Sequence, residues 1–210
     1  MPLAPENYVP QIAPVSAVRR RQAIITWSLT SIFALGVAAL IVSSPLALAS
    51  GYSNLGATIY RGFSLLCHQI PSRSFQLHEH PFAVCARCTG LYFGLAAGMV
   101  TYPLWRSLQR LDTPARGWLI LALLPVGIDF LLGFTGIWEN THWSRAFTGA
   151  ILGVAIAFYL VPGLVDLRFH WRSYFKNRSG VINPVATIDN AVLVVTAPSD
   201  YSKPSRRINI

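Results

Sequence analysis

One uncharged run constrains this chain more than any other feature of the sequence: no Asp, Glu, Lys or Arg occurs between Ala23 and Ala49. A helix needs about 20 consecutive apolar residues to cross the hydrocarbon core of a bilayer, and this run is longer than that. Three consecutive arginines, Arg19, Arg20 and Arg21, precede it. The sequence therefore predicts an integral membrane protein whose first span covers residues 23–49.

The end of this run also has features of a signal-peptide cleavage site, because small residues follow the apolar segment at positions 45–51. Signal peptides carry apolar regions of about 7–15 residues, so we expect the longer segment to be retained as a span. The composition agrees: 53% of the residues are hydrophobic and 12% are charged, whereas soluble domains carry about 25% charged residues. We therefore expect the lipid bilayer as a partner and no nucleic acid.

Three further apolar segments predict three more spans, at residues 83–105, 117–138 and 146–165. Trp118 and Trp138 would lie about 30 Å apart along one helix, which matches the spacing of the two interfacial aromatic belts. The predicted fold class is an all-α integral membrane protein, a four-transmembrane-helix bundle.

The distribution of positive charge predicts the orientation of this bundle. Thirteen of the 17 Lys and Arg residues lie in the N-terminal arm (residues 1–22), in the loop after the second span and in the tail (residues 166–210). The other four are Arg61, Arg73, Arg87 and Arg145. Because cytoplasmic loops are enriched in Lys and Arg, we expect both termini to be cytoplasmic and residues 50–82 to form an extracytoplasmic cap. We expect the polar, basic tail to be largely disordered.

All three cysteines, Cys67, Cys85 and Cys88, fall in or beside this cap. The same stretch carries three histidines: His68, His78 and His80. A C-x-x-C step brings two sulfurs close enough to chelate one metal ion or to form a disulfide, and a third cysteine with one histidine completes a tetrahedral zinc set. We therefore predict a zinc site, structural or ligand-binding, that joins the cap to the second span. His68 adjoins its own cysteine, which makes His78 or His80 the geometrically easier fourth ligand.

Two other uses of the same cysteines stay open. In a thiol-disulfide oxidoreductase, Cys85 and Cys88 would form the redox pair and Cys67 would be the resolving thiol, because a helix N-terminus and Arg87 both favour the thiolate. Four membrane helices with a C-x-x-C motif at the outer end of one of them resemble, in layout only, the quinone-linked thiol oxidases of the disulfide-forming pathway. In the other reading, the cysteines form a structural disulfide or are buried and inert.

Longer motifs around these residues resemble those of a known family. The chain reads Cys-His-Gln at 67–69, Arg-Ser-Phe at 73–75, Cys-Ala-Arg-Cys-Thr-Gly-Leu-Tyr at 85–92 and Gly-Ile-Asp at 127–129. A second signature ends with Asn140, Arg145, Thr148 and Gly149. Together they resemble an uncharacterised bacterial and archaeal family of predicted membrane proteins, domain of unknown function 2085. The resemblance implies a multi-pass protein of a prokaryotic plasma membrane, and it implies no reaction.

Asp129 is the costliest residue of the predicted spans. A charged side chain near the centre of a membrane-spanning helix costs on the order of 2.5–3.5 kcal/mol on insertion scales. We expect this carboxyl group to be neutral or to pair with Arg145, Arg61 or Arg87. The alternative is a proton relay or a ligand contact, as in a transporter or channel component.

Glycines recur every four residues in two of the predicted spans. Gly90, Gly94 and Gly98 lie in the second span, and Gly149 and Gly153 lie in the fourth. Small residues at this spacing let membrane helices approach closely. We expect them to pack two helices together, either within one chain or in a homo-oligomer.

No Walker, Rossmann, nucleophile-elbow or H-E-x-x-H pattern occurs in the sequence. The sequence therefore supports no nucleotide or hydrolase function and leaves open whether the protein is an enzyme. His142, in the second outer loop, could complete the metal site, although a lone loop histidine is more often solvated.

Overall fold

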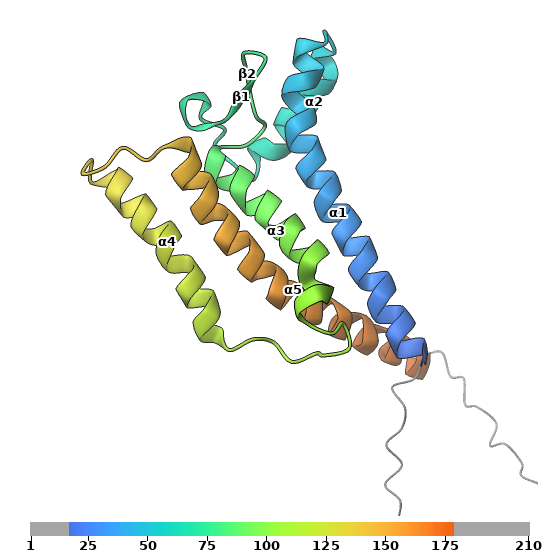
Figure 1. Cartoon of the computed structure of the whole chain (residues 1–210). Coiled ribbons are helices and arrows are strands. Elements are labelled where there is room, and N and C mark those ends of the chain that lie inside the picture. The colour runs from blue at the N-terminus through green and yellow to red at the C-terminus, as the bar shows by residue number, and fades with distance from the viewer. Residues whose placement is uncertain (1–16, 179–210) are drawn as a thin grey trace, which may run out of the picture. The chain divides into compact units, whose positions relative to one another are not determined.

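The computed structural model describes residues 17–178, most of which are helical (Figure 1). The elements, in chain order, are α1 (Ala17–Ala49), α2 (Ser53–Ser64), the 3-10 turn η1 (Pro71–Arg73), β1 (Gln76–Leu77), β2 (His80–Pro81), α3 (Ala86–Trp105), α4 (Arg116–Phe134) and α5 (His142–Arg178). The two short strands pair antiparallel, with Gln76 opposite Pro81 and Leu77 opposite His80. Of the described residues, those up to Ser173 form one unit, and the last five residues of α5 belong to a second. All elements discussed below lie in the first unit.

Three of the described helices are long and apolar enough to cross a membrane. These segments are Arg19–Ala49, Arg116–Phe134 and His142–Trp171. Helix α3 is not among them, because Arg87 and its small and polar residues lower its hydropathy. Many residues of α3 are nevertheless buried inside the protein, and Tyr102 has no exposed surface at all. A helix enclosed by protein needs fewer apolar residues than one that faces lipid, and the crossing of the membrane by the second predicted span, residues 83–105, stays a prediction.

Two helix ends differ from the predicted ones. Helix α4 ends at Phe134, and Gly136 follows with a φ of +71°, a left-handed conformation that suits glycine and stops a helix. Trp138 therefore lies beyond the helix, and our interpretation of Trp118 and Trp138 as the two ends of one helix is wrong. Helix α5 runs past Val165 to Arg178, so residues 166–178 are helical. The rest of the predicted tail lies outside the described residues.

Helices α3 and α5 pack with their backbones in contact. A Cβ atom added to Gly90 would overlap the carbonyl oxygen of Ala146, and one added to Gly149 would overlap the carbonyl oxygen of Arg87. Gly94, Gly98 and Gly153 are equally enclosed. The glycine stripes thus bring two helices together, as predicted, and they do so inside one chain. The facing helix of the same chain covers these glycines, and a homo-oligomer stays a prediction.

Helix α1 covers a second side of α3. The indole N–H of Trp27 donates a hydrogen bond of 2.6 Å to the carbonyl oxygen of Met99. Near the other end of α1, the segment between α1 and α3 builds a separate apolar cluster of Ile41, Phe63, Cys67, Ala83 and Val84. Cys85, Cys88 and Tyr92 pack against this cluster. The cysteines therefore lie where the segment that contains α2 and the hairpin meets the first turn of α3.

Candidate metal centre

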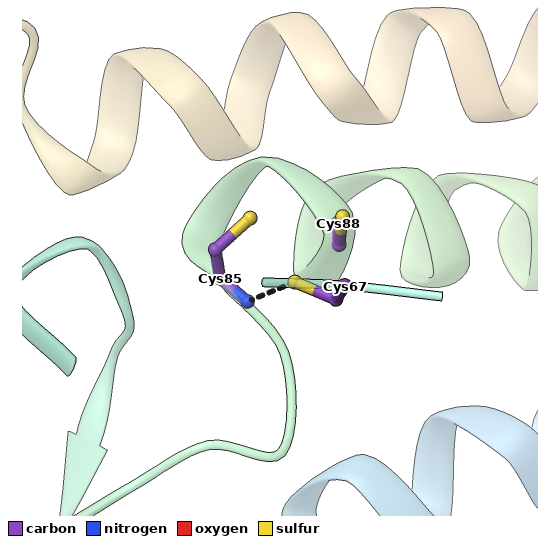
Figure 2. A group of neighbouring side chains, drawn as sticks. All are labelled: Cys67, Cys85 and Cys88. Carbon is purple, nitrogen blue, oxygen red and sulfur yellow. Dashed lines mark hydrogen bonds between the residues drawn. The ribbon is translucent and has the colours of Figure 1, made fainter. Parts of the chain in front are cut away.

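The three cysteines converge at the start of α3 (Figure 2). Their sulfur atoms all lie within 4.8 Å of one another, and all three thiols are free. Cys67 follows α2, Cys85 is the N-cap residue of α3 and Cys88 lies in the first turn of that helix. Cys67 is buried, and the other two are half-buried. This arrangement could hold a metal ion.

Gln69 ties the two cysteine-bearing segments together. Its side-chain amide nitrogen donates hydrogen bonds of 2.7 Å to the carbonyl oxygens of Tyr60, in α2, and Ala83, two residues before Cys85. Its backbone has a φ of +51°, a conformation that a glutamine adopts only where the surroundings hold it. Gln69 therefore fixes the turn that brings Cys67 back toward α3.

Hydrogen bonds reach the sulfurs of Cys67 and Cys85. The backbone N–H of Cys85 donates to the Cys67 sulfur at 3.2 Å (Figure 2), and the N–H of Gln69 donates to the same sulfur at 3.5 Å. A hydrogen bond from the Cys88 thiol lowers the pKa of Cys85, which precedes the helix, to about 5. Thiolates are the form in which cysteine binds metals and reacts as a nucleophile.

The predicted histidines are placed unequally. Among the described residues, the group of candidate ligand atoms within 4.8 Å contains the three sulfurs and no histidine nitrogen. His68 lines the cavity beside these sulfurs. His78 and His80 belong to the hairpin, where His78 and Glu79 make the turn with positive φ angles. Our expectation that the hairpin histidines are better placed than His68 therefore finds no support in this geometry.

His142 contacts an aromatic ring and not the cysteine sulfurs that we considered as its neighbours. Its ring lies 5.9 Å from the ring of Phe75, measured between centroids, and Trp143 contacts the same phenylalanine at 5.2 Å. His142 is not among the residues that line the cavity beside the sulfurs. It joins α5 to the hairpin segment through aromatic packing.

A cavity of about 270 Å³ opens beside the sulfurs. Its polar lining consists of the three cysteines, His68, Asn140 and three arginines, Arg73, Arg87 and Arg145. Its apolar lining consists of Leu66, Ile70, Gly133, Phe130 and Phe134. Thiols and guanidinium groups thus both border the cavity, and no carboxylate is among its lining residues.

Three side chains form polar contacts with Asp129. Its carboxylate pairs with Arg87, one of the three arginines that we considered, and its other carboxylate oxygen accepts a hydrogen bond of 3.0 Å from the hydroxyl of Ser144. The side-chain amide of Asn140 donates to its backbone carbonyl. The Asp129 side chain is 8% exposed, so these contacts supply the polar partners that burial requires.

Gln69 is the residue whose role the motif interpretation missed. It closes the turn after Cys67 through hydrogen bonds to Tyr60 and Ala83. Gln69 stands inside the Cys-His-Gln motif, so its presence was visible in the sequence, but its two partners were not. Arg87 was one of three candidate partners for Asp129, and the structure selects it although the two residues lie 42 positions apart in the chain.

Comparisons with known proteins agree with the motifs. The family described as "Predicted membrane protein (DUF2085)" matches residues 67–159. An uncharacterized protein of Methanocaldococcus jannaschii is 40% identical over 104 residues, which are 50% of this chain and 67% of the relative. An uncharacterized protein of Methanothermobacter thermautotrophicus is 38% identical over 98 residues, 45% of this chain and 84% of the relative. No solved structure matches the chain. The matched range contains the whole cysteine cluster and Asp129.

Proposed function

Because the chain belongs to the DUF2085 family of predicted membrane proteins and its three cysteines converge, we propose that it is a multi-pass membrane protein with a zinc centre on its outer side. The observation that carries this proposal is the set of three free sulfurs within 4.8 Å of one another. The centre would join the segment that contains α2 and the hairpin to α3, and it would have a structural or ligand-binding role.

The ligand chemistry favours a soft metal. Thiolates select zinc, copper(I) or iron–sulfur clusters over the hard cations that carboxylates bind. In a tetrahedral zinc site the sulfurs lie about 2.3 Å from the metal, and therefore about 3.8 Å from one another. Sulfurs within 4.8 Å need to move by only about 1 Å to reach that geometry. Three protein ligands leave a fourth position, which His68 or a ligand from outside the chain would fill.

The distribution of arginine supports the proposed orientation. The C-terminal end of α1 and the N-terminal end of α3 lie on the same side, together with the cysteines (Figure 1). That side carries the arginine-poor segments, which the positive-inside rule assigns to the outside of the cell. With α3 counted as a span beside the three long apolar helices, both termini would be cytoplasmic, and the centre would face the extracytoplasmic side.

Metal analysis tests this proposal directly. Protein purified in detergent without added metal should contain close to one zinc per chain, measured by mass spectrometry of the digested protein. Cys67→Ser, Cys85→Ser and Cys88→Ser should each lose the metal. His78→Ala and His80→Ala serve as matched controls in the hairpin and should keep it. Wild-type protein that contains no transition metal, and whose three thiols are all alkylated rapidly, would overturn the proposal.

A thiol-disulfide oxidoreductase is the second candidate, and the proximity of the same sulfurs favours it. Oxidation of Cys85 and Cys88 to a disulfide releases two electrons and two protons, which a quinone in the bilayer would take up. Acid quenching followed by alkylation would then find both the dithiol and the disulfide in membranes. A pair that is always reduced and is protected by metal would exclude this candidate in favour of the first.

The transport hypothesis depended on Asp129. Both of its carboxylate oxygens are engaged, by Arg87 and by Ser144. Loss of this ion pair would leave Arg87 half-buried without its partner, which is costly. These contacts favour a structural role for Asp129.

A further inference from the structure

The cavity beside the sulfurs carries more positive charge than its surroundings balance. Arg73, Arg87 and Arg145 all line it. Arg87 is paired with Asp129, whereas neither Arg73 nor Arg145 forms a salt bridge with any of the described residues. The positive charges of Arg73 and Arg87 both repel that of Arg145, so each of these guanidinium groups lies close to the third.

Buried polar atoms in the same cavity wall lack partners. Nε of Arg87 and Oδ1 of Asn140 are buried and form no hydrogen bond within the described part of the chain, and both residues line the cavity. A buried donor without a partner destabilises the folded protein. An acceptor inside the cavity could relieve the cost at the arginine and would also offset the repulsion among the arginines.

We propose that this cavity binds a phosphate-type oxyanion between Arg73 and Arg145, beside the open position of the metal centre. Guanidinium groups match the geometry of phosphate oxygens through paired, charge-assisted hydrogen bonds. A phosphate monoester carries a charge of about −1.5 to −2 at neutral pH, which fits two arginines without acidic partners better than a single carboxylate does. The inference deepens the proposed function and rests on it only for the metal beside the anion.

The apolar lining leaves room for two sources of this phosphate group. Leu66, Ile70, Phe130 and Phe134 border the cavity and are partly or largely exposed. They would contact the hydrocarbon part of a lipid whose headgroup occupies the cavity, or they would border a free phosphate compound. The chemistry of recognition by the arginines is the same in both cases.

The test compares the double variant Arg73→Gln/Arg145→Gln with Arg61→Gln. Arg61 is an exposed arginine at the end of α2 that does not line the cavity, so it controls for general attraction of anions to this side. Binding of inorganic phosphate is measured by calorimetry in neutral detergent. Binding of phosphatidate is measured in mixed micelles, with phosphatidylcholine micelles as the uncharged reference. Zinc content is recorded for every sample.

Saturable binding should weaken about tenfold or more in the double variant, the loss expected when a charge-assisted hydrogen bond is removed, and should stay unchanged in Arg61→Gln. Binding of inorganic phosphate identifies a free solute, and saturation by phosphatidate alone identifies a lipid headgroup. Absence of saturable binding to both probes, or equal weakening in both variants, overturns the anion site. If wild-type protein lacks zinc yet shows the expected loss, the metal proposal fails and the anion site stands. If zinc is present and neither probe binds saturably, only the anion site fails.

Discussion

Arg87, at the beginning of α3, forms an ion pair with Asp129 in the second half of α4. The arginine is flanked by two of the three cysteines, so the pair connects the candidate metal centre to a helix that contributes no cysteine. Asp129 is 8% exposed and the arginine side chain 27%. The negative charge of Asp129, which would be costly without a partner in a membrane helix, thereby positions the side chain of Arg87 at the cavity.

Removing this charge should destabilise the protein. Asp129→Asn keeps the shape of the side chain but leaves the half-buried guanidinium of Arg87 without its anion, at a cost of about 1–3 kcal/mol. Thermal unfolding in detergent should show a lower midpoint. Asp166→Asn removes a more exposed carboxylate, 45% accessible, that contacts His170, and it should change the midpoint little. Equal midpoints for the two variants would contradict a structural role for the ion pair.

The packing of α3 on α5 predicts opposite effects for two glycine substitutions. Gly90→Ala would place a methyl group against the backbone carbonyl of Ala146, and backbone cannot move aside as a side chain can. We expect a loss of about 1–3 kcal/mol, as for other overpacked sites. Gly127→Ala meets nothing within 4 Å and should be neutral or stabilising by up to about 1 kcal/mol. Denaturation of both variants under the same detergent conditions measures the difference.

Gln69 should control the metal centre without binding the metal. Gln69→Ala removes both hydrogen bonds that join α2 to the residues before α3 and leaves the fully buried Ala83 without that donor to its carbonyl. We expect zinc affinity to fall about tenfold, equivalent to about 1.4 kcal/mol, in a competition titration with a chromogenic chelator. Gln109→Ala, in an exposed loop, is the matched control. Unchanged affinity in the Gln69 variant would show that the turn is held by other contacts.

Removing the metal should loosen the region around Cys67. A metal that binds only the folded state, present at about 1,000 times its dissociation constant, stabilises that state by about 4 kcal/mol. A strong chelator should therefore lower the unfolding midpoint of the wild-type protein and increase the alkylation of Cys67, which is 7% exposed. Cys85→Ser should not respond to the chelator. A response of the same size in that variant would mean that the chelator acts elsewhere.

The long apolar helices could be predicted from the sequence because each of them depends on a local pattern. The uncharged run that ends at Ala49 and the apolar runs around Ala122 and Ala157 are long enough to indicate helices without knowledge of their neighbours. Helix α2 was not predicted, since Ser53–Ser64 is short and mixes polar with apolar residues. Its helical structure is supported by packing, for example of Phe63 in the cluster with Ile41.

The candidate site was predictable in its composition and less so in its geometry. The clustering of the cysteines within 22 positions indicated a common site, because few turns are needed to bring them together. The choice of histidine could not be made, since it depends on where the hairpin turn at His78 lies relative to α3. The pairing of Asp129 had three candidates among the arginines, and only the packing of α4 distinguishes Arg87 from the others.

Backbone contact between α3 and α5 limits how the cavity can change its size. Two helices that touch at Gly90 and Gly149 have no layer of side chains between them that could rearrange, so neither can slide without collision. Helix α4 has no such backbone contact with the described residues at its glycines, and only Ala122 and Asp129 among its residues are buried, so it is packed less tightly. We therefore expect any change in the size of the cavity to come chiefly from displacement of α4, within the range that the ion pair between Arg87 and Asp129 permits.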